Sequence, residues 1–155
     1  WKIDDISGGH LVVTDNQSLT HPSMNDIRRG LDAKDTVILA HNPKLYHFVL
    51  ATNASWSDDV FSVIDPYFNA TTYTYNETEG QFIVYNIYGI PRDYVYYAQC
   101  NDTWGKDVMG TNGKTICQVG CLMSSISMGM YAYNIPVSIN NQIVPTTPKT
   151  LNIWL

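Results

Sequence analysis

The chain has 155 residues, a length that suits one domain with its own hydrophobic core and is short for two. Hydrophobic residues make up 45% of it and charged residues only 15%, which excludes a disordered chain and a coiled coil. The formal net charge is -5 and the Lys and Arg residues form no basic cluster, so we expect no nucleic-acid partner. No apolar run reaches about 18 residues, so we expect no membrane span.

The predicted elements begin with a short helix over residues 22–31, where Pro22 suits the first turn and Ile27 and Leu31 lie four residues apart. Runs rich in Val, Ile, Tyr, Phe and Thr follow, separated by turn residues. These runs cover residues 36–41, 46–52, 60–65, 70–76, 81–89 and 93–99. Their pattern predicts an antiparallel meander.

The pattern changes after Gly120. Leu122, Ile126 and Met130 repeat every fourth residue, which predicts one buried helix. In the tail, Thr150 is the expected cap of a further helix that opens in LNIWL. We therefore expect a β-rich half over residues 1–86 and a helical half over residues 94–155, with residues 87–93 as the linker.

Five segments fit the Asn-X-Ser/Thr acceptor pattern for N-glycosylation, against about two expected by chance in a chain of this composition. They begin at Asn16, Asn53, Asn69, Asn76 and Asn101. This excess predicts a secreted, extracellular, eukaryotic glycoprotein, and its N-linked glycans would supply the solubility that charged residues usually supply. The three cysteines are odd in number, so an oxidising compartment leaves at least one outside any intramolecular bridge.

A cysteine at the start of the predicted helix suggests nucleophilic catalysis. The helix dipole and unpaired N–H groups would favour the thiolate of Cys121, which then needs a base, an orienter and an oxyanion donor. His47 in the 46–52 strand, Asp65 at the end of the 60–65 strand and Gln99 are the candidates. Taken singly, they also fit a structural histidine, a turn-forming aspartate, a strand-end glutamine and a small buried thiol.

The segments AQCNDTWGKDVMGTNGKTICQVGCLMSSISMGM and TPKTLNIWL resemble the first half of a papain-like cysteine peptidase domain of the bacteriocin-processing (double-glycine) group. YHFVLATNASWSDDVFSVIDPYFNATTYTY resembles its second half. The resemblance implies an α+β, papain-like fold with an antiparallel sheet packed on the nucleophile-bearing helix, a peptide or amide substrate and no cofactor. It assigns Cys121 as nucleophile, His47 as base, Asp65 as its orienter and Gln99 as oxyanion donor.

In this interpretation Cys100 pairs with Cys117 and leaves Cys121 free. A bridge between Cys117 and Cys121 inside one turn is sterically poor but stays open.

The two halves come in the opposite order to the family's. We expect either a circularly permuted domain or a chain that carries the back of one domain and the front of the next in a tandem array, which the abrupt ends at Trp1 and Leu155 favour. A complete site would then need Cys121 and Gln99 of one copy and His47 and Asp65 of its neighbour. Copies joined head to tail would propagate into a filament.

Other functions compete with the enzyme. The first is a structural repeat unit of an extracellular glycosylated filament whose catalytic constellation is idle. The second is carbohydrate binding by exposed Trp and Tyr faces. The third is a zinc site that joins the Cys117 and Cys121 thiols to imidazoles from His10, His21, His41 or His47. Zinc sites usually show two tight ligand pairs, and these histidines are dispersed, so we expect no metal.

Overall fold

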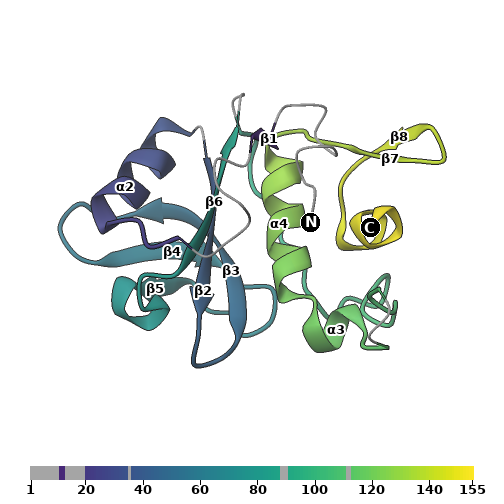
Figure 1. Cartoon of the computed structure of the whole chain (residues 1–155), viewed down its shortest axis with the longest axis horizontal. Coiled ribbons are helices and arrows are strands. Elements are labelled where there is room, and N and C mark those ends of the chain that lie inside the picture. The colour runs from purple at the N-terminus through teal and green to yellow at the C-terminus, as the bar shows by residue number, and fades with distance from the viewer. Residues whose placement is uncertain (1–10, 13–19, 35, 88–90, 111–112) are drawn as a thin grey trace.

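The computed structural model describes residues 11–12, 20–34, 36–87, 91–110 and 113–155, without the side chains of residues 11 and 12. These residues form a mixed α and β structure with an antiparallel sheet and four α-helices (Figure 1). Several sequence predictions lie wholly or partly outside the described residues, among them the acceptor Asn16, the end of the predicted strand at 81–89 and the linker at 87–93.

The sheet has six strands in the order β1-β6-β2-β3-β4-β5, and β1 contributes only two residues. Every neighbouring pair is antiparallel. The strands are β1 (Leu11–Val12), β2 (Thr36–Asn42), β3 (His47–Ala54), β4 (Val60–Ile64), β5 (Thr72–Thr74) and β6 (Phe82–Ile87). The predicted meander is present from β2 to β5, whereas β6 crosses back to pair with β2.

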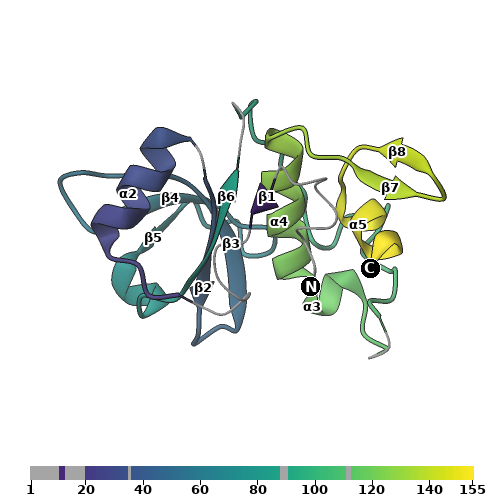
Figure 2. The same cartoon turned by 45° about the horizontal axis from the view of Figure 1, so that its top comes forward.

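Side chains alternate between the two faces of β2, as the period of a strand requires. Ile38 and Ala40 join a buried cluster under helix α2 (Met24–Ala33), and Val37 and Leu39 join a larger cluster under helix α4 (Cys121–Ala132). The two helices therefore cover opposite faces of the sheet (Figures 1 and 2). Each face buries apolar surface, which is the main favourable term in folding.

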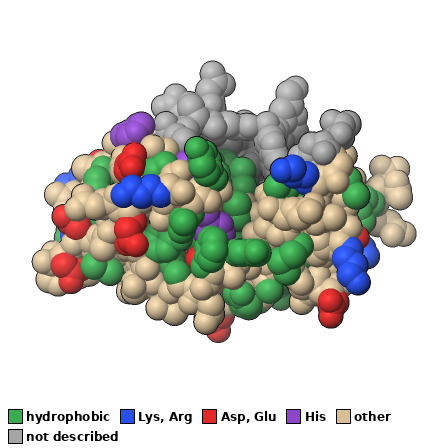
Figure 3. Space-filling view, turned by 90° about the horizontal axis from the view of Figure 1, so that it is seen from below, with side chains coloured by type: hydrophobic (Ala, Val, Ile, Leu, Met, Phe, Trp, Pro, Cys, Tyr) green, Lys and Arg blue, Asp and Glu red, His purple; other side chains and the backbone are tan. Residues whose placement is uncertain are grey.

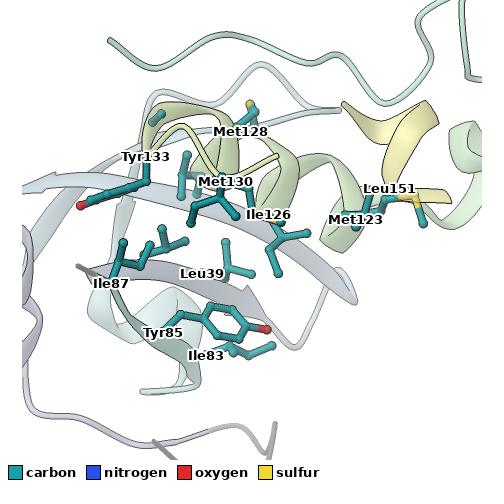
Figure 4. Packing of buried hydrophobic residues seen from close by; sticks show 14 of the residues in the cluster. Leu39, Ile83, Tyr85, Ile87, Met123, Ile126, Met128, Met130, Tyr133 and Leu151 are labelled. Carbon is teal, nitrogen blue, oxygen red and sulfur yellow. The ribbon is translucent and has the colours of Figure 1, made fainter. Parts of the chain in front are cut away.

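Helix α4 lies between the sheet and the C-terminal elements. Ile126 and Met130 belong to the cluster that covers the sheet, and Met123 lies beside Leu151 of α5 (Figure 4). The remaining elements are the 3-10 helix η1 (Tyr75–Thr78), α3 (Ile116–Val119), β7 (Val137–Ile139), β8 (Gln142–Val144) and α5 (Pro148–Trp154). The β7–β8 hairpin and α5 lie on the side of α4 away from the sheet (Figure 2).

The prediction of a strand at 93–99 is wrong. These residues have no regular secondary structure, and Tyr94 and Tyr97 pack against the cluster around α4 instead of joining the sheet. The rings of Tyr97 and Trp104 meet edge to face, with their centroids 5.6 Å apart. Aromatic residues favour strands only where a sheet offers them neighbours, and here the rings of Trp104 and of Tyr131 on α4 contact Tyr97 instead.

Two features of the C-terminal region also differ from the prediction. Helix α5 begins earlier, because the side chain of Thr147, not that of Thr150, caps it by accepting a hydrogen bond from the Thr150 backbone N–H. The β7–β8 hairpin was not predicted from the sequence. Both residues of its turn, Asn140 and Asn141, have positive φ. No helix among the described residues is long and apolar enough to cross a membrane.

Gly129 sets how closely α4 approaches the sheet. A Cβ atom at this position would lie 2.7 Å from one methyl carbon of Val37 and 3.0 Å from the other. Gly129→Ala should lower the free energy of unfolding by about 1–2 kcal/mol in a urea titration, because overpacking outweighs the gain in helix propensity. In a Val37→Ala background the same substitution should be neutral or stabilising. A Gly129→Ala variant more stable than the original chain would contradict the close packing.

Candidate active site

The turn between β2 and β3 places His47 at the first position of β3. The side-chain oxygen of Asn42 accepts hydrogen bonds from the backbone N–H groups of Lys44 and Leu45, at 3.1 and 3.3 Å, and so closes the turn. Tyr46 completes the turn with a φ of 50°. Asn42 and His47 are cross-strand partners, so the turn fixes the imidazole at the end of the sheet.

Asp65 follows the last residue of β4 and contacts His47. Its Oδ1 atom lies 2.8 Å from Nε2 of His47, and both side chains are buried. The same oxygen accepts hydrogen bonds from the backbone N–H groups of Tyr67 and Phe68, each at 2.8 Å. Asp65 therefore shapes the turn after β4 and holds the imidazole at the same time.

Cys121 is the first residue of α4 and has a free thiol that is partly exposed. The His47 side chain and the backbone of Phe48 and Leu122 lie close enough to the thiol to influence its ionisation. One turn further along α4, the Ser125 hydroxyl donates to the Phe48 carbonyl oxygen at 3.1 Å, which fastens the start of the helix to β3. Because Nε2 of His47 faces Asp65, its other ring nitrogen is the one left for the thiol.

The protonation states of these three groups support one another. Burial opposes a charge on His47, but hydrogen bonds to Asp65 and Cys121 and their negative charges raise its pKa to about 9. Burial also opposes the Cys121 thiolate, yet the His47 hydrogen bond and charge and the Phe48 and Leu122 backbone contacts lower its pKa. For Asp65, the contacts with His47, Tyr67 and Phe68 outweigh burial and lower the pKa. All three shifts act in the direction of a thiolate–imidazolium pair beside an ionised carboxylate.

A pocket of about 350 Å³ opens over His47 and Cys121. It is lined by Leu45, Tyr46, His47, Tyr67, Phe68, Gln99, Gln118, Val119 and Cys121. The Phe68 ring meets the imidazole edge to face, with a centroid distance of 4.9 Å. Figure 3 shows the corresponding face, where hydrophobic side chains gather around a histidine. Apart from His47, the lining contains no ionisable side chain but the thiol and the Tyr hydroxyls, so the pocket suits an uncharged ligand.

Gln99 lies in the same pocket and is almost fully buried. Its side-chain Nε2 donates to the Cys117 carbonyl oxygen at 2.7 Å, and its backbone N–H donates to the Pro66 carbonyl oxygen at 2.8 Å. Cys117 forms a disulfide with Cys100, as expected, so the alternative bridge to Cys121 is absent. The structure thus brings together all four residues that the sequence singled out.

The other predicted sites lie elsewhere on the surface. Asn53, Asn69, Asn76 and Asn101 are exposed, as glycan acceptors must be. Among the described residues, no cluster of three or more His, Cys, Asp or Glu side chains is arranged to hold a metal ion. His10, one of the histidines weighed as a zinc ligand, lies outside these residues.

The sequence reasoning did not identify the aromatic wall of the pocket. Tyr67 and Phe68 are about half exposed, at 53% and 52%, and follow directly after the Asp65-Pro66 turn. A signal was present, because two large apolar residues in a turn beside a candidate catalytic carboxylate have no core to enter.

Comparisons of the chain with protein-family models, with curated proteins and with solved structures found no match.

The ion pair predicts how fast Cys121 reacts with iodoacetamide at different pH values. At pH 6 an ordinary thiol is about 0.3% thiolate, whereas the lowered pKa of Cys121 gives it a larger thiolate fraction, so the original chain should react at least tenfold faster than His47→Ala. The two rates should converge as pH rises past about 9, where His47 loses its proton.

Peptide mass spectrometry after timed labelling gives the alkylation rate of Cys121 in each variant. His21→Ala is the matched control, because His21 is exposed and lies outside the pocket lining, and it should leave the alkylation rate of Cys121 unchanged. Equal rates for the original chain and His47→Ala at pH 6 would contradict the ion pair.

Proposed function

We propose that this protein is a cysteine peptidase or amide hydrolase that acts through Cys121, His47, Asp65 and Gln99. The observation that carries the proposal is that one imidazole, that of His47, interacts with the Cys121 thiol and with the Asp65 carboxylate at the same time. Nucleophilic catalysis requires a nucleophile, a base within hydrogen-bond reach and a third group that orients the base. The resemblance to papain-like peptidases of the bacteriocin-processing group supports the same assignment.

The reaction has two steps. The Cys121 thiolate attacks the amide carbonyl carbon and forms a C–S bond, while the carbonyl oxygen becomes an oxyanion that accepts hydrogen bonds from the Gln99 amide and the Cys121 backbone N–H. The C–N bond then breaks, and His47 gives its proton to the leaving amine. In the second step His47 takes a proton from water, the resulting hydroxide displaces the thiolate from the thioester, and the acid leaves.

The pocket supports a substrate whose side chain near the scissile amide is apolar. Tyr46, Tyr67 and Phe68 present aromatic surface beside the nucleophile, and burying such surface favours a hydrophobic or aromatic partner. An acidic or basic side chain there would lose its hydration without gaining an ion partner. We therefore expect peptides with large apolar residues to be preferred over peptides with Asp, Glu or Lys.

The disulfide also bears on where the protein works. Disulfides persist in oxidising compartments, so the Cys100–Cys117 bridge is compatible with an extracellular protein. Together with the excess of glycosylation acceptors, it supports a secreted glycoprotein.

Hydrolysis of a peptide coumarylamide library tests the activity. Cys121→Ala should reduce turnover to background, and His47→Ala should lower kcat/KM by about 10²–10⁴-fold, because the base and acid are lost. His21→Ala should match the original chain. A Cys121 that is alkylated rapidly but hydrolyses no library member would contradict the hydrolase. A Cys121 that is also unreactive would favour the idle site of a structural filament subunit.

The aromatic wall can be tested separately with the same library. Tyr67→Ala should lower kcat/KM roughly tenfold for substrates with a large apolar residue beside the amide and should change it little for glycine. Tyr96→Ala is the matched control, because Tyr96 is similarly exposed, at 55%, but lies outside the pocket lining. An equal loss for apolar and glycine substrates would show that Tyr67 does not select the substrate.

A further inference from the structure

Two kinds of link connect the segment of Gln99 to Cys117, which lies in α3, the single helical turn before α4. The Gln99 side chain donates to the Cys117 carbonyl oxygen at 2.7 Å. The next residue along the chain, Cys100, is bonded to the Cys117 sulfur, and the two Cα atoms lie 4.3 Å apart. The disulfide therefore fixes the distance between the backbone that carries Gln99 and the carbonyl group that its amide contacts.

This contact decides how the Gln99 amide is oriented. A Gln amide nitrogen carries two N–H donors, and the Cys117 carbonyl takes one of them, which leaves the second for a ligand in the pocket that Gln99 shares with Cys121. The Oε1 atom is buried without a hydrogen-bond partner among the described residues. Within the described residues, the Cys117 carbonyl is thus the only hydrogen-bond partner that orients the amide group.

The turn itself has other supports. The Cys117 backbone N–H donates to the Gly105 carbonyl oxygen at 3.0 Å, and the Ile116 N–H donates to that of Asp107 at 2.9 Å. These hydrogen bonds hold the turn to the preceding loop whether or not the bridge is present. The bridge adds a direct constraint between the turn and the Gln99 segment.

We propose that the Cys100–Cys117 disulfide is a positioning element for the oxyanion donor Gln99. With the bridge in place, the Cys117 carbonyl holds one amide N–H and directs the other toward the oxyanion. Without the bridge, the turn and the Gln99 segment separate, and the amide no longer stabilises the transition state. This inference rests on the proposed hydrolase function and adds the two bridged cysteines as residues that act through Gln99.

A double-mutant cycle on kcat tests the positioning role. In the bridged protein, Gln99→Ala should lower kcat about 10²–10³-fold, the usual loss for one oxyanion donor. The double variant C100S/C117S should lose most of the same factor in kcat while its KM stays within about threefold, because ground-state binding does not use the donor. In the C100S/C117S background, adding Gln99→Ala should lower kcat less than about threefold further. A full additional loss, showing that the two effects are independent, would overturn the proposal.

A measurement on the resting protein separates this inference from the proposed function. In ¹⁵N-glutamine-labelled protein, the side-chain signal that disappears in Gln99→Ala should show slow hydrogen exchange and a shift away from that of a free amide. In C100S/C117S it should move toward the free-amide position. This result supports the positioning even if no substrate is hydrolysed, whereas an unchanged signal would overturn it.

The double variant must be folded for either comparison, which circular dichroism establishes. If it does not fold, the spectrum is recorded after a water-soluble phosphine reduces the bridge of the original chain. That reaction yields two thiols and the phosphine oxide, whose oxygen comes from water. Unfolding under both conditions would also overturn the proposal, because the bridge would then be a requirement of the fold and not of the Gln99 position.

Discussion

The hydrogen bond between His47 and Asp65 is the constraint on which the rest of the site depends. Both groups are buried, and a buried charge is costly unless it is paired and hydrogen-bonded. One oxygen of Asp65 meets that requirement for the imidazolium, and it also holds the Tyr67 and Phe68 backbone. Asp65 therefore contributes to three features of the site: the orientation of the imidazole, the position of the aromatic wall and the raised pKa of His47.

The two halves of the chain meet at a few specific contacts around this pair. Ser125 on α4 donates to the carbonyl of Phe48, the residue after the base, and Gln99 donates through its backbone to the carbonyl of Pro66, the residue after the carboxylate. All four candidate residues therefore come together within one copy of the chain, although His47 and Asp65 precede Gln99 and Cys121 in sequence. The proposed catalysis does not depend on this order, because a site is defined by geometry.

The sheet was largely predictable because its signals are local. Alternation along β2 and β3 separates Val37 and Leu50 from Ile38 and Val49, and the structure places these pairs on opposite faces. The 93–99 segment misled the prediction, since Tyr and Val are equally suited to packing under a helix. The candidate residues were named from the sequence, but the distances between them depend on the tertiary fold and could not be predicted. The contact of Gln99 with Cys117 depends on an irregular segment, whose conformation leaves no periodic pattern in the sequence. The aromatic wall was missed because Tyr67 and Phe68 belong to a turn.

The most direct measurement is an NMR titration of the His47 ring nitrogens in the resting protein, with the signals assigned by their loss in His47→Ala. The account predicts that His47 is an imidazolium at pH 7.5 and loses its proton near pH 9, because Asp65 and the Cys121 thiolate hold the charge. An imidazole that titrates near its ordinary pKa of about 6.5 would contradict the ion pair and, with it, the proposed chemistry.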